Sequence, residues 1–148
     1  IIRDLIHKAS RKAIEYALNC EANTIIIGNN KEWKQECDLG KVNNQTFVQI
    51  PYLDFINQVK YKAEEYGINV IITEESYTSG TSFLDDELPI KENYNKSRRI
   101  KRGLFKSGKG LINSDVNGAF QIIRKVFSNA FRCYEIEGLG YSPIRVGL

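Results

Sequence analysis

Two short stretches decide how this chain folds: TIIIG at residues 24–28 and NVIIT at residues 69–73. Both are rich in β-branched residues and apolar at consecutive positions, which is typical of strands buried on both faces. The chain between them has a helical apolar spacing, formed by Tyr52, Phe55, Ile56, Val59, Ala63 and Tyr66. A helix between two such strands forms a βαβ unit with parallel pairing. We therefore predict an α/β fold with parallel strands and flanking helices.

The first half of the chain is predicted from local signals. Residues 3–19 place apolar side chains at three- and four-residue steps, which predicts a helix. Residues 29–46 are polar and predict a long loop. Pro51 then fits the first turn of the next helix, where its missing N–H is not needed, and Gly67 fits the end of that helix.

The second half contains a long segment without regular periodicity. Residues 76–112 predict an irregular insertion with a short hairpin around residues 100–112. Asp115 is predicted to cap a last helix over residues 116–130, which has one apolar face. The glycine-rich tail at residues 139–148 carries no clear structural signal.

The composition indicates one soluble domain or most of one, since 42% of the 148 residues are hydrophobic. No apolar run is long enough to span a membrane and no signal-peptide pattern opens the chain, so we expect cytoplasmic residence. The sequence begins with Ile1 and contains no methionine, which suggests a fragment of a longer protein. Two predicted strands are too few to cover three helices. We therefore expect either further strands upstream or a second copy of the chain, as a homo-oligomer, to complete the sheet.

The net charge is only +3, but many basic residues are concentrated in one stretch. This stretch contains Lys96, Arg98, Arg99, Lys101, Arg102, Lys106 and Lys109. Such a block binds phosphate or an acidic surface, or is a solvated loop. A second stretch at residues 28–35 carries Lys31, Trp33 and Lys34, which could contact a nucleic-acid backbone and stack on a base, or could form an ordinary surface turn.

Carboxylates occur where α/β sheets place their sites. Glu74 and Glu75 end the second predicted strand, and sites in open α/β sheets lie outside the carboxyl ends of strands. Because a strand alternates its side chains, one of the two faces a site and the other faces solvent, or both simply end a charged strand. Asp115 is either a helix cap or a metal ligand. Asn117 and Gly118 are poor helix formers, which indicates that something besides helix stability selected them.

The cysteines Cys20, Cys37 and Cys133 are far apart, and His7 is the only histidine. Without paired CxxC motifs the chain cannot build a zinc ribbon from local ligands, so we predict no structural zinc. The thiols are expected to be buried or inert.

Together and in this order, the motifs resemble the C-terminal region of the OrfB/TnpB family, transposon-encoded relatives of type V CRISPR effector nucleases. The matching stretches cover nearly the whole chain. They are GNNKEWKQ (28–35), NNQTFVQIP (43–51), YKAEEYGINV (61–70), EESYTSGTSFLD (74–85), RRIKRGLF (98–105) and INSDVNGA (112–119). The most specific part is YTS at residues 77–79 followed by DVNGA at residues 115–119.

The resemblance implies that residues 1–148 are part of a RuvC-like, RNase H-type nuclease domain, in which clustered carboxylates hold Mg²⁺ or Mn²⁺ ions that activate water. Of the family's three acidic ligands, Asp115 matches the last, the first would lie upstream, and the second falls at Gly28. We expect Glu74, or else Glu75, to replace this missing ligand, so that Glu74 and Asp115 share the metal. The insertion stands where the family carries a zinc ribbon, and we predict a small apolar core for it from Phe83, Leu84, Ile90, Ile100, Leu104 and Phe105.

The resemblance also implies a function. Members of the family carry a guide RNA and cut DNA that pairs with it, so pairing reads the sequence while the protein holds the backbone. We therefore expect DNA and guide RNA as partners, and a metal-dependent DNA endonuclease of a mobile element as the full-length protein, with this fragment alone inactive. The alternative, which Gly28 favours, is a nucleic-acid-binding module of the same family that has lost cleavage.

Overall fold

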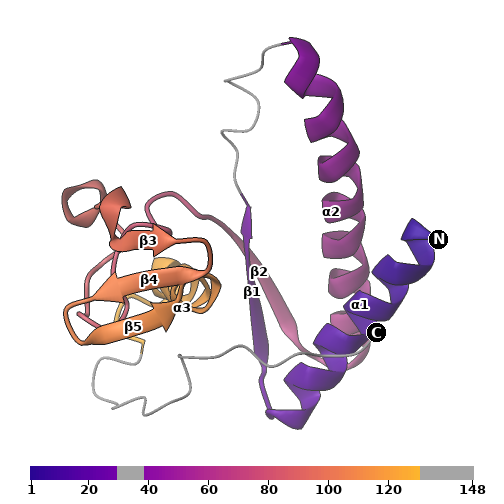
Figure 1. Cartoon of the computed structure of the whole chain (residues 1–148). Helices are drawn as coiled ribbons and strands as arrows, with labels where there is room; N and C mark the ends of the chain where they lie inside the picture. The colour runs from indigo at the N-terminus through magenta and orange to yellow at the C-terminus, as the bar shows by residue number, and fades with distance from the viewer. Residues whose placement is uncertain (30–38, 131–148) are drawn as a thin grey trace. The chain divides into compact units, whose positions relative to one another are not determined.

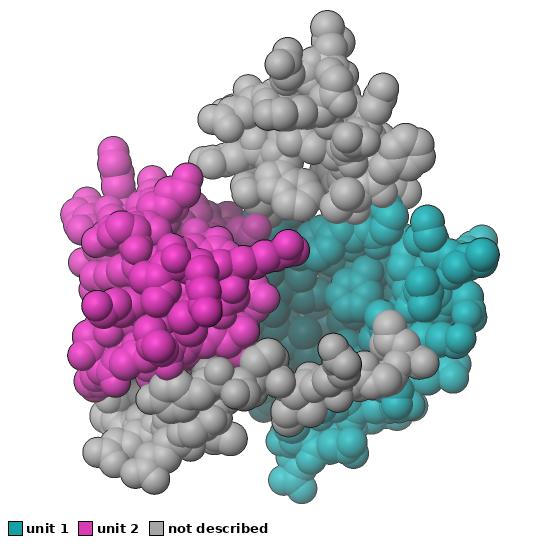
Figure 2. Space-filling model, in the orientation of Figure 1, with its two compact units in different colours: residues 1–72, 146–148 teal, residues 73–145 magenta. Residues whose placement is uncertain are grey.

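The computed structural model describes residues 1–29 and 39–130, with side chains described at 1–29 and 51–130. The chain forms two compact units, drawn in teal and magenta in Figure 2. Unit 1 contains the described residues up to Ile72, and unit 2 contains those from Thr73 to Ala130. No helix among the described residues is both long and apolar enough to cross a membrane.

Unit 1 is built from two helices and two strands (Figure 1). In chain order they are α1 (Ile2–Asn19), β1 (Thr24–Asn29), α2 (Leu39–Glu65) and β2 (Asn69–Glu74), the last two residues of which fall in unit 2. β1 and β2 form a two-stranded parallel sheet, joined through α2. The mixed α/β class is therefore confirmed. The helix predicted over residues 3–19 and the strands predicted at residues 24–28 and 69–73 are confirmed as α1, β1 and β2.

The core of unit 1 lies where α1 packs on α2. Ile14 and Ala17 of α1 pack in one buried cluster with Val59 and Ala63 of α2, and Ile68 completes it. Partly buried side chains of β1 and β2 pack against this cluster. The predicted apolar face of α2 therefore packs in the core through Val59 and Ala63, whereas only Ala17 of the apolar residues expected on one face of α1 is part of it.

The predicted start of α2 is wrong. The helix begins at Leu39, and Pro51 lies inside it. An interior proline removes one helical hydrogen bond and tends to kink the helix, but here the 27-residue helix continues through it. Of the loop predicted over residues 29–46, residue 29 belongs to β1 and residues 39–46 belong to α2, and residues 30–38 lie outside the described part. The predicted end is confirmed, because Gly67 adopts a φ of +68°, the left-handed conformation typical of a glycine after a helix.

Unit 2 begins as irregular chain and ends with a small sheet and a helix (Figure 1). Its elements are the 3-10 helices η2 (Lys91–Asn93) and η3 (Lys96–Arg98), the strands β3 (Arg99–Lys101), β4 (Leu104–Ser107) and β5 (Gly110–Asn113), and α3 (Ser114–Val126). The predicted hairpin is confirmed as the antiparallel pair β4 and β5. β3 adds a third antiparallel strand with an irregular register, which the sequence pattern did not indicate.

Asp115 does not cap α3, contrary to the prediction. The cap is Asn113, whose Oδ1 accepts the N–H groups of Asp115 and Val116 at 2.9 and 3.1 Å. Asparagine and aspartate are about equally good caps, so the residue types do not decide between the two positions. Asp115 lies instead in the first turn of α3, where the helix dipole stabilises a negatively charged side chain.

The interior of unit 2 is small and partly polar. Of the six apolar residues predicted for its core, Phe83 and Phe105 are buried and the two leucines are half-buried, whereas Ile90 and Ile100 are 43% and 51% exposed. Ile100 falls in β3, where every residue is exposed. Ile112, opposite Phe105 in the hairpin, is buried in their place. Polar side chains supply much of the remaining interior.

Candidate nucleic-acid interface

The inward face of α3 is polar and holds the irregular chain of unit 2 in place. Its buried residues follow the spacing of one helix face: Ser114, Asn117, Gln121 and Arg124. Asn117 Oδ1 accepts the N–H of Phe83, and Asn117 Nδ2 donates to the main-chain oxygen of Thr81, both at 2.9 Å. The fully buried side chain of Asn117 thereby supplies hydrogen-bond partners to two main-chain groups of a segment that is neither strand nor helix.

Gln121 extends this contact by one turn of α3. Its Nε2 donates to Thr81 Oγ1 and to the main-chain oxygen of Glu87, both at 2.9 Å. Thr81 Oγ1 in turn donates to the main-chain oxygen of Tyr77 at 2.7 Å. The helix therefore fixes the segment after β2 through several linked hydrogen bonds.

Arg124 completes the contact at the end of α3. Only 2% of the residue is exposed, and its guanidinium donates to the main-chain oxygen of Phe83 at 3.0 Å and to Asp86 Oδ1 at 2.8 Å. The same guanidinium lies 4.3 Å from the centre of the Phe83 ring, which stacks on Phe120 at 4.2 Å. The set is here termed the clasp: Asn117, Gln121 and Arg124 with the segment 81–87 that they hold.

Arg98 is used inside unit 2. Its guanidinium donates to both carboxylate oxygens of Glu87, one of them at 2.7 Å. Glu87 also accepts the N–H of Ser82 at 2.8 Å. The hydrogen bond to Glu87 holds the pKa of the Arg98 guanidinium above its usual range. The contact of Arg98 with nucleic acid stays a prediction. Glu87 compensates the charge of this half-buried residue, so Arg98 attracts anions less than its exposed basic neighbours do.

The exposed basic neighbours of Arg98 follow one another along the chain without an acidic residue between them. This set is here termed the basic strip: Lys96, Arg99, Lys101, Arg102, Lys106 and Lys109. These residues lie on η3, β3, β4 and the turns beside them, and no acidic residue occurs between positions 93 and 114. Lys106 stands opposite the exposed Leu111 in the hairpin. Uninterrupted exposed cations attract phosphate groups, and this is the electrostatic footprint of a nucleic-acid contact.

The tip of the β4–β5 hairpin is fixed from within unit 2. Asp85 Oδ2 accepts the N–H of Gly108 at 2.8 Å, and a Cβ added at Gly108 would lie 2.6 Å from Asp85 Oδ1. Ser107 Oγ donates to the main-chain oxygen of Gly110 at 2.7 Å and accepts the N–H of Lys109 at 3.1 Å. The basic strip is therefore presented partly on backbone that side chains hold in one conformation.

The predicted metal ligands lie at different places in unit 2. Glu74, at the end of β2, accepts a hydrogen bond from Lys125 Nζ at 2.7 Å and another from the N–H of Ser76 at 2.8 Å. Asp115 is exposed in the first turn of α3, ten residues before Lys125, which is about 15 Å along a helix axis. Glu75 is half-buried, and burial together with the nearby charge of Glu74 raises the pKa of its carboxyl.

These carboxylates do not by themselves fit a two-metal site. The described residues contain no group of three or more His, Cys, Asp or Glu side chains that could hold a metal ion. Glu74 already contacts the Lys125 ammonium, so sharing a metal with Asp115 would require Glu74 to leave it. The shared site stays a prediction. The absence of structural zinc also stays a prediction: neither cysteine nor histidine occurs between positions 38 and 132. Cys20 in unit 1 is exposed rather than buried.

Sequence reasoning missed most of the clasp. Asn117 gave a signal, because an asparagine early in a helix is a poor helix former, and its contacts with main-chain groups now explain it. Gln121 and Arg124 gave no signal, because polar residues of an amphipathic helix are normally assigned to its solvent face. The predicted contact residues Lys31, Trp33 and Lys34 lie outside the described part of the chain.

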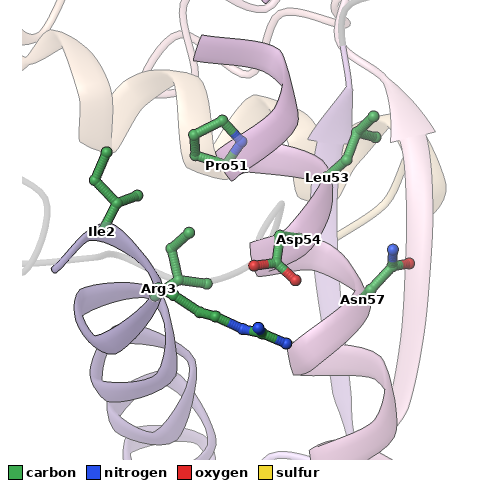
Figure 3. Close-up of a pocket in the computed structure, with 7 residues that line it drawn as sticks. Ile2, Arg3, Pro51, Leu53, Asp54 and Asn57 are labelled. Carbon is green, nitrogen blue, oxygen red and sulfur yellow. The ribbon is translucent and has the colours of Figure 1, made fainter. Parts of the chain in front are cut away.

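A groove of 520 Å³ lies in unit 1 between α1 and α2 (Figure 3). It is lined by Ile2, Arg3 and Ile6 of α1 and by Pro51, Leu53, Asp54 and Asn57 of α2. Arg3 and Asp54 extend from the two helices toward the space between them (Figure 3). The lining is mostly apolar and brings together no set of catalytic or metal-ligating side chains, so it carries no functional assignment.

Comparisons with known proteins bear on the segment that contains these features. Residues 52–122 match the family described as Cas12f1-like, TNB domain. A solved structure, the cryo-EM structure of the Cas12f1-sgRNA-target DNA complex, is similar with a TM-score of 0.56 and 21% sequence identity. That match covers 81% of this chain and 32% of that chain, so this chain spans about a third of its length. No curated protein matches the sequence.

The family match contains the basic strip, Asp115 and most of the clasp. It therefore covers the part of the chain with the strongest indication of nucleic-acid contact. The similarity to the solved structure extends over both units but, at its low identity, concerns the fold. Residues 52–122 thus resemble the TNB domain of Cas12f1-like proteins, and the chain shares its fold with part of Cas12f1.

Proposed function

We propose that this chain is part of an RNA-guided nuclease of the OrfB/TnpB type, and that unit 2 holds the nucleic-acid backbone through the basic strip. The observation that carries this proposal is the presence of six exposed cations in a segment whose sequence, from residue 93 to residue 114, contains no acidic residue. The similar Cas12f1 structure is a complex with sgRNA and target DNA, which supports guide RNA and DNA as the partners here.

The basic strip is suited to phosphates rather than to base edges. Lysine and arginine contacts to phosphate position a protein on nucleic acid without reading its sequence. In a guided nuclease the pairing between guide and target supplies the sequence information. Such a contact depends strongly on salt, because each neutralised phosphate releases bound counterions.

For the full-length protein we propose a RuvC-like, metal-dependent DNA endonuclease encoded by a mobile element and resident in the cytoplasm. Asp115 supports a cation site because its carboxylate is exposed, and Mg²⁺ and Mn²⁺ prefer carboxylate oxygen. Glu74 or Glu75 would be the second ligand. Since the described carboxylates do not cluster, the fragment alone is proposed to be inactive and to need strands upstream or a second copy to complete its sheet.

A second candidate is a nucleic-acid-binding module that does not cleave. Two observations favour it. Gly28 stands where the resemblance expects a glutamate ligand, and Glu74 is paired with Lys125. Both candidates bind nucleic acid through unit 2, and they differ only in whether a metal site is completed elsewhere.

Two measurements test the proposal. Binding of labelled duplex DNA to the chain, followed over a series of salt concentrations, should show affinity that falls steeply as salt rises. Cleavage of guide-matched DNA by the full-length protein with Mg²⁺, repeated with Asp115→Ala, separates the candidates. Loss of cleavage in the variant supports the nuclease, whereas salt-dependent binding without cleavage by either protein supports the binding module. Absence of binding at low salt would overturn both.

A further inference from the structure

Two tyrosines form an exposed aromatic pair in unit 2 that backbone binding does not explain. The ring centres of Tyr77 and Tyr94 are 5.7 Å apart and the planes meet at 71°, an edge-to-face contact. Even so, 37% of Tyr77 and 38% of Tyr94 remain exposed. The two residues come from separate segments, the turn after β2 and the stretch between η2 and η3. An aromatic pair that stabilises a core is normally buried, whereas this pair lies at the surface.

The backbone at Tyr77 is strained. Its φ is +65°, a left-handed conformation that a bulky side chain rarely adopts. The clasp imposes this turn, because Thr81 Oγ1 donates to the main-chain oxygen of Tyr77 and accepts from Gln121. Strained residues that surrounding contacts hold in place occur preferentially at binding sites, so the position of the Tyr77 ring calls for a function.

A glycine makes room for the second ring. A Cβ added at Gly80 would lie 2.4 Å from an edge atom of the Tyr94 ring, so only glycine allows the ring to lie where it does. The N–H of Asn95 donates to the main-chain oxygen of Gly80 at 2.8 Å and joins the two segments. Both tyrosines are therefore positioned by the chain around them.

The charges around the pair suit nucleic acid. Lys125 Nζ lies 5.7 Å from the centre of the Tyr77 ring and pairs with Glu74, which compensates that carboxylate. Lys91 and Lys96 are exposed and flank Tyr94 in the sequence, and the exposed Glu92 lies between Lys91 and Tyr94. Exposed aromatic rings with cations beside them bind single strands, because bases stack on the rings while the cations contact phosphates.

We propose that Tyr77 and Tyr94 form a stacking site for an unpaired base of single-stranded nucleic acid, with Lys91 and Lys96 at the adjacent phosphates. This inference rests on the proposed function and deepens it, since the basic strip binds backbone of either kind whereas the tyrosines require an unpaired base. A base in a duplex is stacked on its neighbours and is not accessible to the two rings.

The test compares two probes of equal charge on the full chain: a short oligothymidylate and an oligonucleotide of the same length whose residues are all abasic. The wild-type chain should bind oligothymidylate about tenfold more tightly, in keeping with the stacking of one base on an aromatic side chain. Tyr94→Leu and Tyr77→Leu should remove this preference, and Tyr94→Phe and Tyr77→Phe, which keep the ring, should preserve it. A preference that persists in the leucine variants would overturn the stacking site and leave the pair as a brace of the turn.

A variant of the basic strip, Lys101→Gln with Lys106→Gln, separates this inference from the proposed function. It should weaken binding of both probes equally and leave the preference unchanged. Equal binding of the two probes by the wild type overturns the stacking site alone, and no binding of either probe overturns both proposals. If the leucine variants do not fold, photocrosslinking of wild type to an oligonucleotide with 5-iodouracil decides, because the crosslink should map to Tyr77 or Tyr94. A crosslink confined to other residues would contradict the proposal.

Discussion

Replacing Lys101, Arg102 and Lys106 together by glutamine should reduce the salt dependence of duplex binding. All three side chains are exposed and lie in the middle of the basic strip, so their removal leaves the clasp intact. Each phosphate contact contributes about 0.9 to the slope of log affinity against log salt on duplex DNA. Three lost contacts therefore lower the slope by about 2.7.

This change in slope is large enough to measure. Between about 50 and 200 mM salt, the wild-type chain should lose roughly 40-fold more affinity than the triple variant. The assay is fluorescence anisotropy of a labelled duplex at several salt concentrations, with thermal unfolding to show that the variant is folded. Glutamine keeps the side chains polar and removes their charge, so a difference in slope reports mainly on charge.

A matched control removes equal charge from unit 1. The chain carries a net charge of +3, and Lys8, Lys12 and Lys60 are exposed lysines outside the basic strip. Their replacement by glutamine gives the same net charge as the first variant. If the two triple variants show the same slope, binding responds to overall charge and the assignment of the basic strip is wrong.

Three further changes test the interior and the carboxylates. Asn117→Ala should lower the free energy of unfolding, measured by urea titration, by about 2–4 kcal/mol, because it leaves two buried main-chain groups without a hydrogen-bond partner. The control Ala119→Ser, at an exposed position of the same helix, should change the free energy of unfolding little. Burial and then Glu74 raise the pKa of Glu75, so the folded state binds this proton more tightly than the unfolded state and stability falls as pH rises through the raised pKa. Glu75→Gln should therefore raise the melting temperature at pH 7 by an amount that vanishes in acid, and a constant gain at all pH values would contradict this. Asp115→Ala should abolish Mg²⁺-dependent cleavage by the full-length protein with little change in DNA affinity, and a cleavage assay beside a binding titration checks both.

The order of elements in unit 1 could be predicted because the pattern of apolar residues distinguishes its helices from its strands. The apolar runs at residues 24–28 and 69–73 became β1 and β2. The strands are not buried on both faces as predicted, because most of β1 is only half-buried and Asn69, Ile72 and Glu74 of β2 are exposed. The start of α2 could not be predicted from Pro51, since a proline marks a first turn only by preference and a long helix can continue through it.

Unit 2 was predicted less well because polar contacts decide its shape. Its hairpin followed from local signals, but Ile90 and Ile100 are exposed where an apolar core was expected. The buried face of α3 carries Gln121 and Arg124, and hydrophobic periodicity cannot identify a face that is stabilised by hydrogen bonds. The basic strip was visible in the sequence, whereas the neutralisation of Arg98 by Glu87 depends on a contact that composition does not reveal.

The clasp also implies that its helix residues and the segment 81–87 tolerate mutation to different degrees. Asn117, Gln121 and Arg124 bind mainly peptide groups of the segment 81–87, which every amino acid except proline can supply in full. Outside Thr81, Phe83 and Asp86, whose side chains also contact α3, the segment can therefore vary in sequence more freely than the three helix positions. Related proteins would be expected to differ more in this loop than at those positions, and a library of variants intended to alter unit 2 is best directed to the loop.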